Sequence, residues 1–278
     1  MRKKLGIWFG FSSLIFWIEL FFREFTILET GWNLRLGFNN DGLDVVLNRL
    51  KNGKLSRQGV LGVNIGPNYN SNSFEDDFCQ GVKELTKLSL ADYITINISS
   101  PNTENLRDFH EQNKLESLMK IINKTKKSIK REDLPIFLKV SPDIKDSSIE
   151  MITGIVIEQN IKGLILTNTT NENRASLKSL EKKQSGGLSG KPIRELSNTM
   201  IRKFYNQLKG KANIVGVGGV DSGQSAFEKI SAGANVVQLY TGMIYQGPGV
   251  VKKIKKELIE ILKKEKIKNI TEAVGINS

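Results

Sequence analysis

Six short apolar segments of the chain each end in polar residues or glycines. The endings are residues 64–66, 97–103, 139–141, 167–170, 216–219 and 240–242. The densest is residues 97–103, Asn-Ile-Ser-Ser-Pro-Asn-Thr, where Pro101 ends an extended run because it fixes φ and cannot donate a ladder hydrogen bond. Packing a hydrophobic core does not require these amides and hydroxyls. For any one such segment alone, an ordinary polar loop tip is the alternative interpretation. Their recurrence predicts a ligand site assembled from several strand ends.

Two side chains in these segments could take part in a reaction directly. Ser100 is the best candidate for proton transfer, because it precedes the strand-ending Pro101 and no catalytic His or Cys competes with it. A serine base is weak alone and needs activation by neighbours or by water. Lys139 interrupts an apolar run, where it could neutralise a developing anion or extend to the surface as an ordinary lysine. We interpret His110 and Cys79 as structural.

Asparagines recur among the strand ends and turns. They are Asn39, Asn64, Asn97, Asn102 and Asn168. Amides donate and accept hydrogen bonds in fixed planes, which suits a flat heterocycle bearing imide groups. Taken singly, each of these asparagines is more typical of a turn. Taken together, they predict the binding of a planar ligand with several hydrogen-bonding groups.

Glycines dominate residues 216–223, which follow a predicted strand and open a predicted helix. Glycines let backbone N–H groups approach a phosphate, and the field of a helix N-terminus favours an anion. The next strand ends in Tyr240-Thr241-Gly242, and the loops after the last two strands are the usual phosphate site of β/α barrels. Two tight turns are the alternative. A dinucleotide-binding fingerprint fits poorly, because the glycine spacing is wrong.

Strands and helices are predicted to alternate along the chain. We expect strands at residues 60–65, 93–98, 136–140, 163–167, 214–217 and 236–240, and helices at 43–50, 74–90, 115–129, 149–159, 192–208, 225–232 and 250–262. Alternation predicts parallel pairing with helical crossovers. An open doubly wound sheet would bind ligands only at its switch point, so polar residues at six strand ends favour an α/β fold of the β/α (TIM-type) barrel class. Six of the eight strands of a closed barrel are recognisable.

The composition excludes several other kinds of site. The net charge is +12, but the basic residues are dispersed without a basic-aromatic strip, so we expect no nucleic-acid binding. A single cysteine rules out an internal disulfide and a cysteine-based metal site. One histidine likewise argues against a histidine-based metal site, so no metal is expected.

We divide the chain into an atypical N-terminal segment, residues 1–34, and a barrel domain, residues 35–278. Residues 5–22 are strongly apolar and follow Arg2-Lys3-Lys4, which is typical of a membrane-associating segment. The alternatives are a buried segment or a stretch that is not native to this fold. No strand–helix–strand pattern precedes residue 35, and the chain is expected to be irregular from Phe22 to Trp32.

The motifs, in order, resemble those of dihydroorotate dehydrogenase, and specifically the membrane-associated, quinone-using class. The resemblance runs from about residue 35 to the C-terminus and rests on residues 97–107, 138–143, 167–170, 186–192, 218–219 and 238–241. The cytosolic classes usually carry a cysteine base. In this sequence Ser100 stands at the similar position, which favours the quinone-using class. The resemblance implies an FMN-containing barrel that oxidises dihydroorotate to orotate in pyrimidine (UMP) biosynthesis, with electrons passing to a membrane quinone.

The resemblance also implies roles for individual residues. Ser100 would remove a proton from the ring while a hydride passes to the flavin, under a lid at residues 174–184. The expected substrate contacts are Asn39, Asn97, Asn102, Asn168 and Thr169. The expected FMN contacts are Asn64, Asn97, Lys139, Thr167, Gly190, Gly219, Tyr240 and Thr241. The protein would associate peripherally with a membrane, at the cytoplasmic face of a bacterial inner membrane or at a mitochondrial inner membrane.

The first 34 residues depart from the family pattern. An Ala-Gly-Phe-Asp-Lys-type strand and a strand ending in Gly-Thr are both absent from them. We therefore expect a barrel that lacks two strands, from a truncated or mis-translated start, which would leave unpaired edges. Two further hypotheses remain open. One is a non-catalytic remnant that retains no FMN, and the other is an FMN-dependent barrel reductase of different activity.

Overall fold

Strands and helices alternate along most of the chain in the computed structural model, which describes residues 6–11, 14–19, 25–28, 31–34, 41–52, 59–68, 70–89, 91–172, 174–175 and 177–278. The strands are β1 (Gly6–Phe11), β2 (Leu14–Glu19), β3 (Phe25–Leu28), β4 (Gly31–Leu34), β5 (Gly62–Ile65), β6 (Tyr93–Asn97), β7 (Ile136–Val140), β8 (Gly163–Leu166), β9 (Gly187–Gly190), β10 (Asn213–Val217) and β11 (Val236–Leu239). The α-helices are α1 (Leu43–Asn52), α2 (Phe74–Lys87), α3 (Gln112–Ser128), α4 (Asp146–Glu158), α5 (Arg194–Leu208), α6 (Gly223–Ser231), α7 (Thr241–Gln246) and α8 (Val250–Lys264). Short 3-10 helices lie at η1 (Leu106–His110), η2 (Leu180–Lys183), η3 (Lys191–Ile193) and η4 (Ile270–Ala273). The six predicted strands are confirmed, as β5, β6, β7, β8, β10 and β11.

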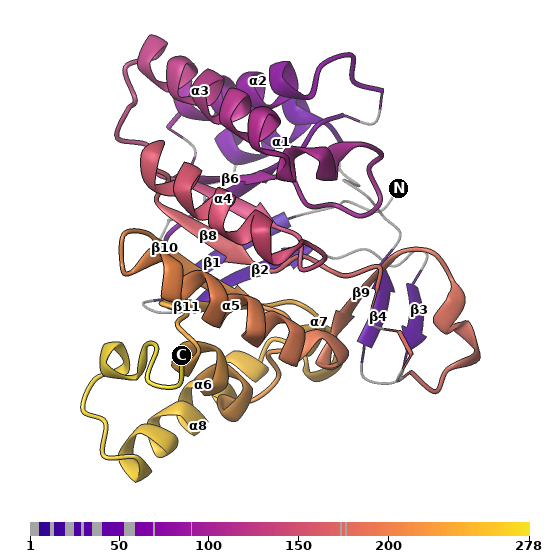
Figure 1. Cartoon of the computed structure of the whole chain (residues 1–278), viewed down its shortest axis with the longest axis vertical. Helices are drawn as coiled ribbons and strands as arrows, with labels where there is room; N and C mark the ends of the chain where they lie inside the picture. Colours follow the sequence, from indigo (N-terminus) through magenta and orange to yellow (C-terminus); the bar gives the residue numbers. More distant parts are fainter. Residues whose placement is uncertain are drawn as a thin grey trace.

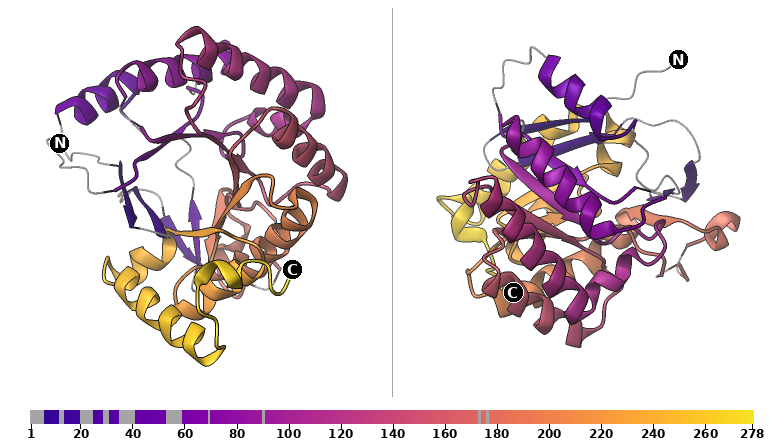
Figure 2. Two further views of the ribbon diagram at one scale, coloured as in Figure 1. Left: turned by 90° about the vertical axis from the view of Figure 1, so that its left-hand side faces the viewer. Right: turned by 90° about the horizontal axis from the view of Figure 1, so that it is seen from above.

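One curled sheet of eight strands runs in the order β1-β2-β11-β10-β8-β7-β6-β5. All neighbours from β11 to β5 are parallel, and helices connect them on the outside of the sheet (Figure 1). Strand β2 continues the parallel order beside β11, whereas β1 pairs antiparallel with β2. No described pairing joins β1 to β5, and the helices form an arc (Figure 2). Among the described residues the fold is thus a TIM-type β/α barrel that is open along one side.

The two faces of each barrel strand carry different residues. On β6, Ile94 and Ile96 belong to the hydrophobic core under the helices, so the intervening Thr95 faces the barrel interior. The same alternation puts Lys139 of β7 and Gln238 of β11 on the interior face. The interior positions at the carboxyl ends of the strands are therefore the polar ones.

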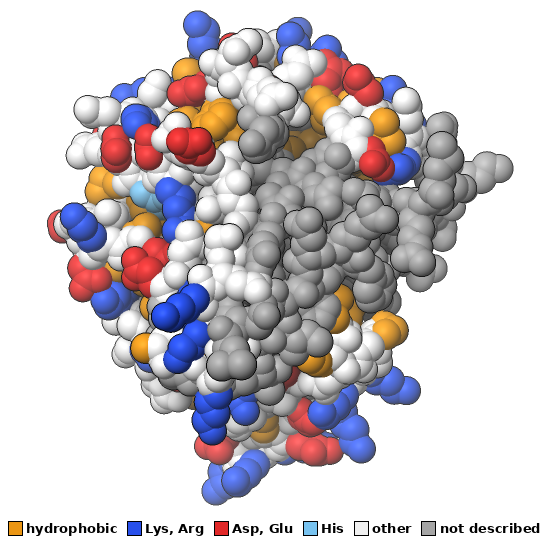
Figure 3. All heavy atoms as spheres, turned by 90° about the vertical axis from the view of Figure 1, so that its right-hand side faces the viewer, with side chains coloured by type: hydrophobic (Ala, Val, Ile, Leu, Met, Phe, Trp, Pro, Cys, Tyr) orange, Lys and Arg blue, Asp and Glu red, His pale blue; other side chains and the backbone are white. Residues whose placement is uncertain are grey.

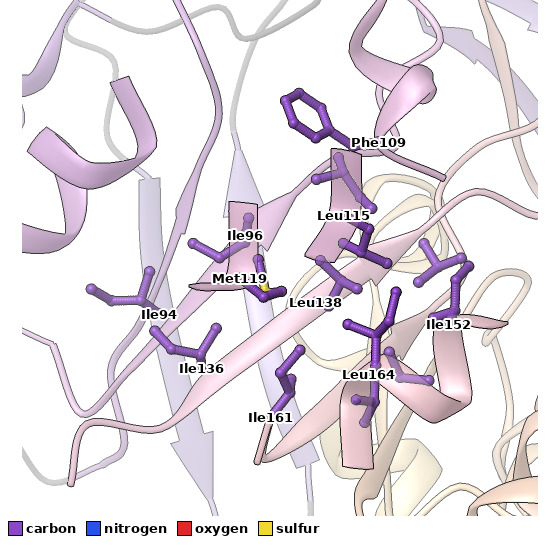
Figure 4. Packing of buried hydrophobic residues seen from close by; sticks show 14 of the residues in the cluster. Ile94, Ile96, Phe109, Leu115, Met119, Ile136, Leu138, Ile152, Ile161 and Leu164 are labelled. Atoms are coloured by element: carbon purple, nitrogen blue, oxygen red, sulfur yellow. The ribbon is translucent and has the colours of Figure 1, made fainter. Parts of the chain in front are cut away.

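The main core lies between the sheet and the helices that cover it. Figure 4 shows apolar side chains of β6, β7 and β8 packing together with those of α3 and α4. They include Ile94, Ile136, Leu138 and Leu164 from the strands and Leu115, Met119 and Ile152 from the helices. A second cluster joins β11, α6 and α8 through Val237, Phe227 and Ile254 among others. These two clusters fix the strand ends rigidly, which is what a site built from successive strands requires.

The N-terminal residues differ from expectation. We predicted that no barrel strand precedes residue 35, but β1 and β2 extend the main sheet. The irregular course predicted from Phe22 to Trp32 is also wrong, because β3 and β4 lie there. Strands β3 and β4 form a second, three-stranded sheet with β9. A continuous apolar run has no period that distinguishes strand from helix, which is why the pattern failed here. In the described part of the chain, no helix is both long and apolar enough to span a bilayer.

Candidate active site at the strand ends

A cavity opens at the carboxyl ends of β7, β8, β10 and β11, bounded also by β9. It encloses about 590 Å³ of empty space, counting the part at its open mouth. The predicted residues on its wall are Lys139, Thr167, Asn168, Thr169, Gly190, Gly219, Tyr240 and Thr241. On the face of the molecule drawn in Figure 3, the described Lys and Arg side chains are interspersed with Asp and Glu.

Asn97 and Asn168 are joined by a hydrogen-bond network. The amide nitrogen of Asn168 donates to the Asn97 carbonyl oxygen (3.4 Å) and to the Ser99 hydroxyl (3.0 Å). The Ser99 hydroxyl in turn donates to the Asn97 carbonyl oxygen at 3.0 Å. Each amide is therefore held in one orientation by its neighbours before any ligand binds, which is the arrangement that planar recognition requires.

Ser100 is buried just beyond the end of β6, with 6% of its surface exposed. Its oxygen accepts a hydrogen bond from the backbone N–H of Asn102 (3.3 Å) and one from the Thr103 hydroxyl (3.4 Å). Two donors aimed at one oxygen favour its negatively charged form. The sequence did not single out Thr103, although it stands in the same motif.

Several buried polar atoms at this end of the barrel lack a hydrogen-bond partner in the described structure. They are Asn64 Oδ1, Thr95 Oγ1, Thr167 Oγ1 and Gln238 Oε1. Leaving such an atom unpaired costs about 1–3 kcal/mol of folding free energy, so a ligand or water is expected to bind each of them. Asn64 and Thr95 are direct register partners on β5 and β6. Thr95 was not predicted, because a threonine in an apolar strand resembles an ordinary β former.

Glycines form the wall of the cavity on the β10 side. Gly219 has φ +74°, and a Cβ there would lie 2.8 Å from Arg194 Cβ and 3.0 Å from the Gly190 carbonyl oxygen. Gly218, at φ +120°, packs against Ser197 in the same way. Arg194 holds this loop from behind, because its Nε donates to the Gly219 carbonyl and its guanidinium pairs with Asp221. At Gly218 and Gly219 a side chain would therefore collide with these neighbours, so the chain presents backbone there.

A partly buried ion pair connects three of the strand-end loops. Arg107 contacts Asp143 at 3.0 Å and donates to the Thr169 carbonyl at 3.4 Å. Asp143 also accepts from the Thr170 hydroxyl and from the backbone N–H of Asn171. The loops after β6, β7 and β8 thus share one charge-assisted network. Sequence patterns did not reveal it, because its partners are far apart along the chain.

His110 stabilises this arrangement as a neutral side chain. Its Nδ1 donates to the Arg107 carbonyl at 2.8 Å, and its Nε2 accepts from the Ser141 backbone N–H at 3.2 Å. Burial is the main cause that lowers the pKa of His110 to about 4. The predicted structural role of His110 fits this geometry, because both ring nitrogens are already bonded to backbone groups.

The predicted lid, residues 174–184, borders a second cavity beside Pro101, Asn102 and Glu104. Arg174 organises this segment by donating to the carbonyls of Asn171 (3.1 Å), Lys182 (3.3 Å) and Gln184 (2.9 Å), and to that of Gly186. The two cavities are neighbours, because a Cβ at Gly187 would touch both Thr169 and Pro101.

The predicted site residues are mostly, but not all, brought together. Asn102 lies on the second cavity, and Asn97 is linked to the first cavity through Asn168. Ser100 and Asn64 line neither cavity wall directly. Asn39 lies outside the described residues. The cavity wall also contains Ser189, which hydrogen-bonds Thr241 at 2.9 Å and which the sequence did not single out.

The chain matches a family model described as dihydroorotate dehydrogenase over residues 26–262. It is 40% identical over 250 residues to the mitochondrial dihydroorotate dehydrogenase (quinone) of Mus musculus, covering 87% of this chain and 63% of the mouse protein. It is 39% identical over 239 residues to a dihydroorotate dehydrogenase (quinone) of Bartonella tribocorum, covering 85% of this chain and 65% of that protein. The chain thus spans a little under two thirds of the length of these relatives.

Solved structures show the same likeness. The crystal structure of DHODH from Eimeria tenella in complex with ferulenol is similar with a TM-score of 0.82 and 35% identity, covering 90% of this chain and 72% of that one. A ligand-free structure of DHODH from the same organism gives a TM-score of 0.81 at 36% identity, covering 89% and 74% of the two chains. The open barrel therefore matches solved structures of these proteins over most of its length.

Proposed function

The chain belongs to the dihydroorotate dehydrogenase family, and on that premise we propose that it oxidises dihydroorotate to orotate with bound FMN and passes the electrons to a membrane quinone. The observation that carries this proposal is the pairing of two walls around one cavity. One wall offers the amide of Asn168, held by Asn97 behind it and near the buried Ser100, and the other includes the backbone of Gly218 and Gly219. Such a combination suits a planar substrate next to a phosphate-bearing cofactor.

The residues present fit FMN in two respects. Thr167 Oγ1 and Gln238 Oε1 are buried at the cavity without partners, and a flavin ring edge supplies donors and acceptors for such atoms. Gly219 and Gly190 approach so closely that a side chain at Gly219 would fill the space between them. We propose that Asn64, Asn97, Lys139 and Thr167 hold the flavin ring. Gly190, Gly219, Tyr240 and Thr241 would hold the ribityl phosphate through backbone N–H groups.

Substrate would lie against the side-chain wall. We propose that Asn39, Asn97, Asn102, Asn168 and Thr169 bind the pyrimidine, in planes set by the Asn97–Ser99–Asn168 network. When bound, FMN supplies the acceptor for the hydride that the substrate loses. Lys139, on the strand beside Asn97, would favour negative charge at the flavin edge.

Ser100 would take the proton that leaves the substrate ring. The Asn102 N–H and the Thr103 hydroxyl both point at its oxygen, which stabilises the serine in the form that accepts a proton. His110 cannot serve as the base, since both of its ring nitrogens are engaged with backbone. The lid segment organised by Arg174 would exclude bulk water while the proton moves.

The electrons would leave through a quinone in a membrane. We propose peripheral association with a bacterial inner membrane, at its cytoplasmic face, or with a mitochondrial inner membrane. The sequence supports this through the apolar residues 5–22 and the preceding Arg2-Lys3-Lys4. Residues 35–278 would form the FMN-binding domain, whose sheet β1 and β2 extend, and residues 1–34 would contribute the membrane contact.

The proposal is tested by the stoichiometry of the overall reaction. Purified protein in detergent is supplied with dihydroorotate and a short-chain quinone, and orotate and quinol are measured together. We expect one orotate for each quinol, as a two-electron oxidation requires. A protein that binds flavin but forms no orotate would favour a reductase of different activity. A protein that binds no flavin would favour the non-catalytic remnant.

A further inference from the structure

Lys229 is a fully buried lysine on α6, close behind the glycine wall of the cavity. None of its surface is exposed, and Gly216 of β10 leaves room for its aliphatic stem, because a Cβ there would lie 3.2 Å from Lys229 Cδ. A buried ammonium is costly unless it is paired with an opposite charge. The function proposed above does not use this residue.

The ammonium of Lys229 has only neutral acceptors in the described part of the chain. Its Nζ donates to the Ser197 hydroxyl at 2.9 Å and to the Asn198 carbonyl oxygen at 3.0 Å. No carboxylate forms a salt bridge with it among the described residues. Burial is the main cause that lowers the pKa of Lys229 to about 7, and the nearby Arg194 lowers it further, whereas Glu195 and Glu228 act in the opposite direction.

Ser197 connects this lysine to the loop that forms the glycine wall. The Ser197 hydroxyl donates to the Val217 carbonyl at 2.6 Å, and Val217 is the last residue of β10 before Gly218 and Gly219. The same carbonyl accepts the backbone N–H of Thr167 at 3.0 Å. Gly218 in turn packs on Ser197, whose Oγ would lie 3.3 Å from a Cβ at that position. Lys229 is therefore linked through one hydroxyl to the residue from which the glycine loop begins.

We propose that Lys229 is a positioning residue for the FMN phosphate. The phosphate, bound on the other side of the glycine loop, would compensate the buried charge of Lys229, which forms no salt bridge among the described residues. The inference rests on the proposed function, because it assumes that the loop binds a phosphate. Lys229 does not touch the ligand. It orients Gly218 and Gly219 through Ser197 and adds a positive field behind them, so that an anion bound at the loop completes a charge pair that the protein alone leaves incomplete.

The test compares two flavins that differ only in the phosphate. The full chain is freed of flavin, and the dissociation constants of FMN and riboflavin are measured by quenching of flavin fluorescence. For Lys229→Met, which keeps the length of the side chain and removes the charge, we expect FMN affinity to fall about tenfold or more. Riboflavin affinity should stay within about twofold, because the ring and ribityl contacts are unchanged.

The matched control is Lys126→Met on α3. Lys126 is also largely buried, with 8% of its surface exposed, but it lies beside Asp133 and Lys162, which precede β7 and β8 at the opposite end of the barrel. It should change the affinity for neither flavin. Should Lys229→Met fail to fold, Ser197→Ala tests the orienting link alone, since it removes the hydrogen bond to Val217 and keeps the charge of Lys229. It too should lower FMN affinity more than riboflavin affinity.

Equal losses of FMN and riboflavin affinity, or no loss of either, would overturn the inference, because the lysine would then have only a packing role. Orotate formation by the FMN-loaded wild-type protein tests the proposed function separately. A wild-type chain that forms orotate while Lys229→Met shows no selective loss would contradict the role of Lys229 alone. A wild-type chain that binds no flavin would contradict both.

Discussion

The two walls of the cavity bind by different means. After β7 and β8 the wall presents side chains such as Lys139 and Asn168, and Asn168 is hydrogen-bonded to Asn97 behind it. After β10 it presents the backbone of Gly218 and Gly219, with Arg194 and Lys229 behind them. The first wall can recognise the pattern of donors and acceptors on a ring, whereas the second can recognise the charge of an anion. Under the proposed function, the chemistry would take place at the first wall and the cofactor would be anchored at the second.

Removing the serine hydroxyl should affect the side-chain wall alone. For Ser100→Ala we expect the rate of flavin reduction by dihydroorotate to fall by about 10²–10⁴, the usual contribution of a positioned proton acceptor. Retention of FMN through gel filtration should be unchanged, since the Ser100 oxygen faces Asn102 and Thr103. Stopped-flow absorbance at neutral pH measures the rate, and an unchanged rate would exclude Ser100 as the base.

Acid should loosen the side-chain wall through His110. Its pKa in the folded protein is about 4, below the unfolded value of 6.5, so its contribution to stability is full above pH 6.5 and is lost as the pH falls toward 4. The lowered pKa corresponds to a loss on the order of 3 kcal/mol across that window. Urea unfolding at several pH values measures it.

The control is His110→Gln, which cannot gain a charge. Its unfolding free energy should fall less steeply between pH 6.5 and 4 than that of the wild type, although it starts lower. Parallel pH profiles for the two proteins would show that His110 does not control the acid response.

The glycine wall can be altered by one methyl group. For Gly219→Ala, whose Cβ would lie 2.8 Å from Arg194 Cβ, we expect FMN affinity to fall by about tenfold, with riboflavin affected less. Gly210→Ala is the matched control, because Gly210 has a similar φ of +77° but nothing within 4 Å of the added Cβ. It should lower stability by about 1 kcal/mol and leave FMN affinity unchanged. Equal FMN affinities for the two variants would mean that the glycine wall does not contact the phosphate.

The two walls also differ in how far the sequence could predict them. The strand ends, and with them Lys139, Asn168 and Gly219, followed from short apolar runs that stop at polar residues, because parallel strands bring those ends to one face. The supports behind them did not follow. Arg107 and Asp143 are 36 positions apart, and Lys229 looks like any lysine of an amphipathic helix. Their roles depend on burial, which a single sequence does not record.

The N-terminal strands were missed for a different reason. Residues 6–19 are apolar almost throughout, so their pattern has neither the period of a strand nor that of a helix. The pairing partner decides that this segment is a strand, because β2 lies beside β11, which comes more than two hundred positions later in the chain. Pairings of that separation are set by tertiary structure and leave no local trace.

The central claim is that one cavity holds FMN and dihydroorotate in reactive contact. The most direct measurement is the visible absorption spectrum of the gel-filtered protein, recorded without oxygen before and after addition of dihydroorotate. We predict flavin bands that survive gel filtration and bleach on adding the substrate. Flavin bands that persist unchanged in the presence of dihydroorotate, or a colourless protein that no added FMN restores, would contradict the claim.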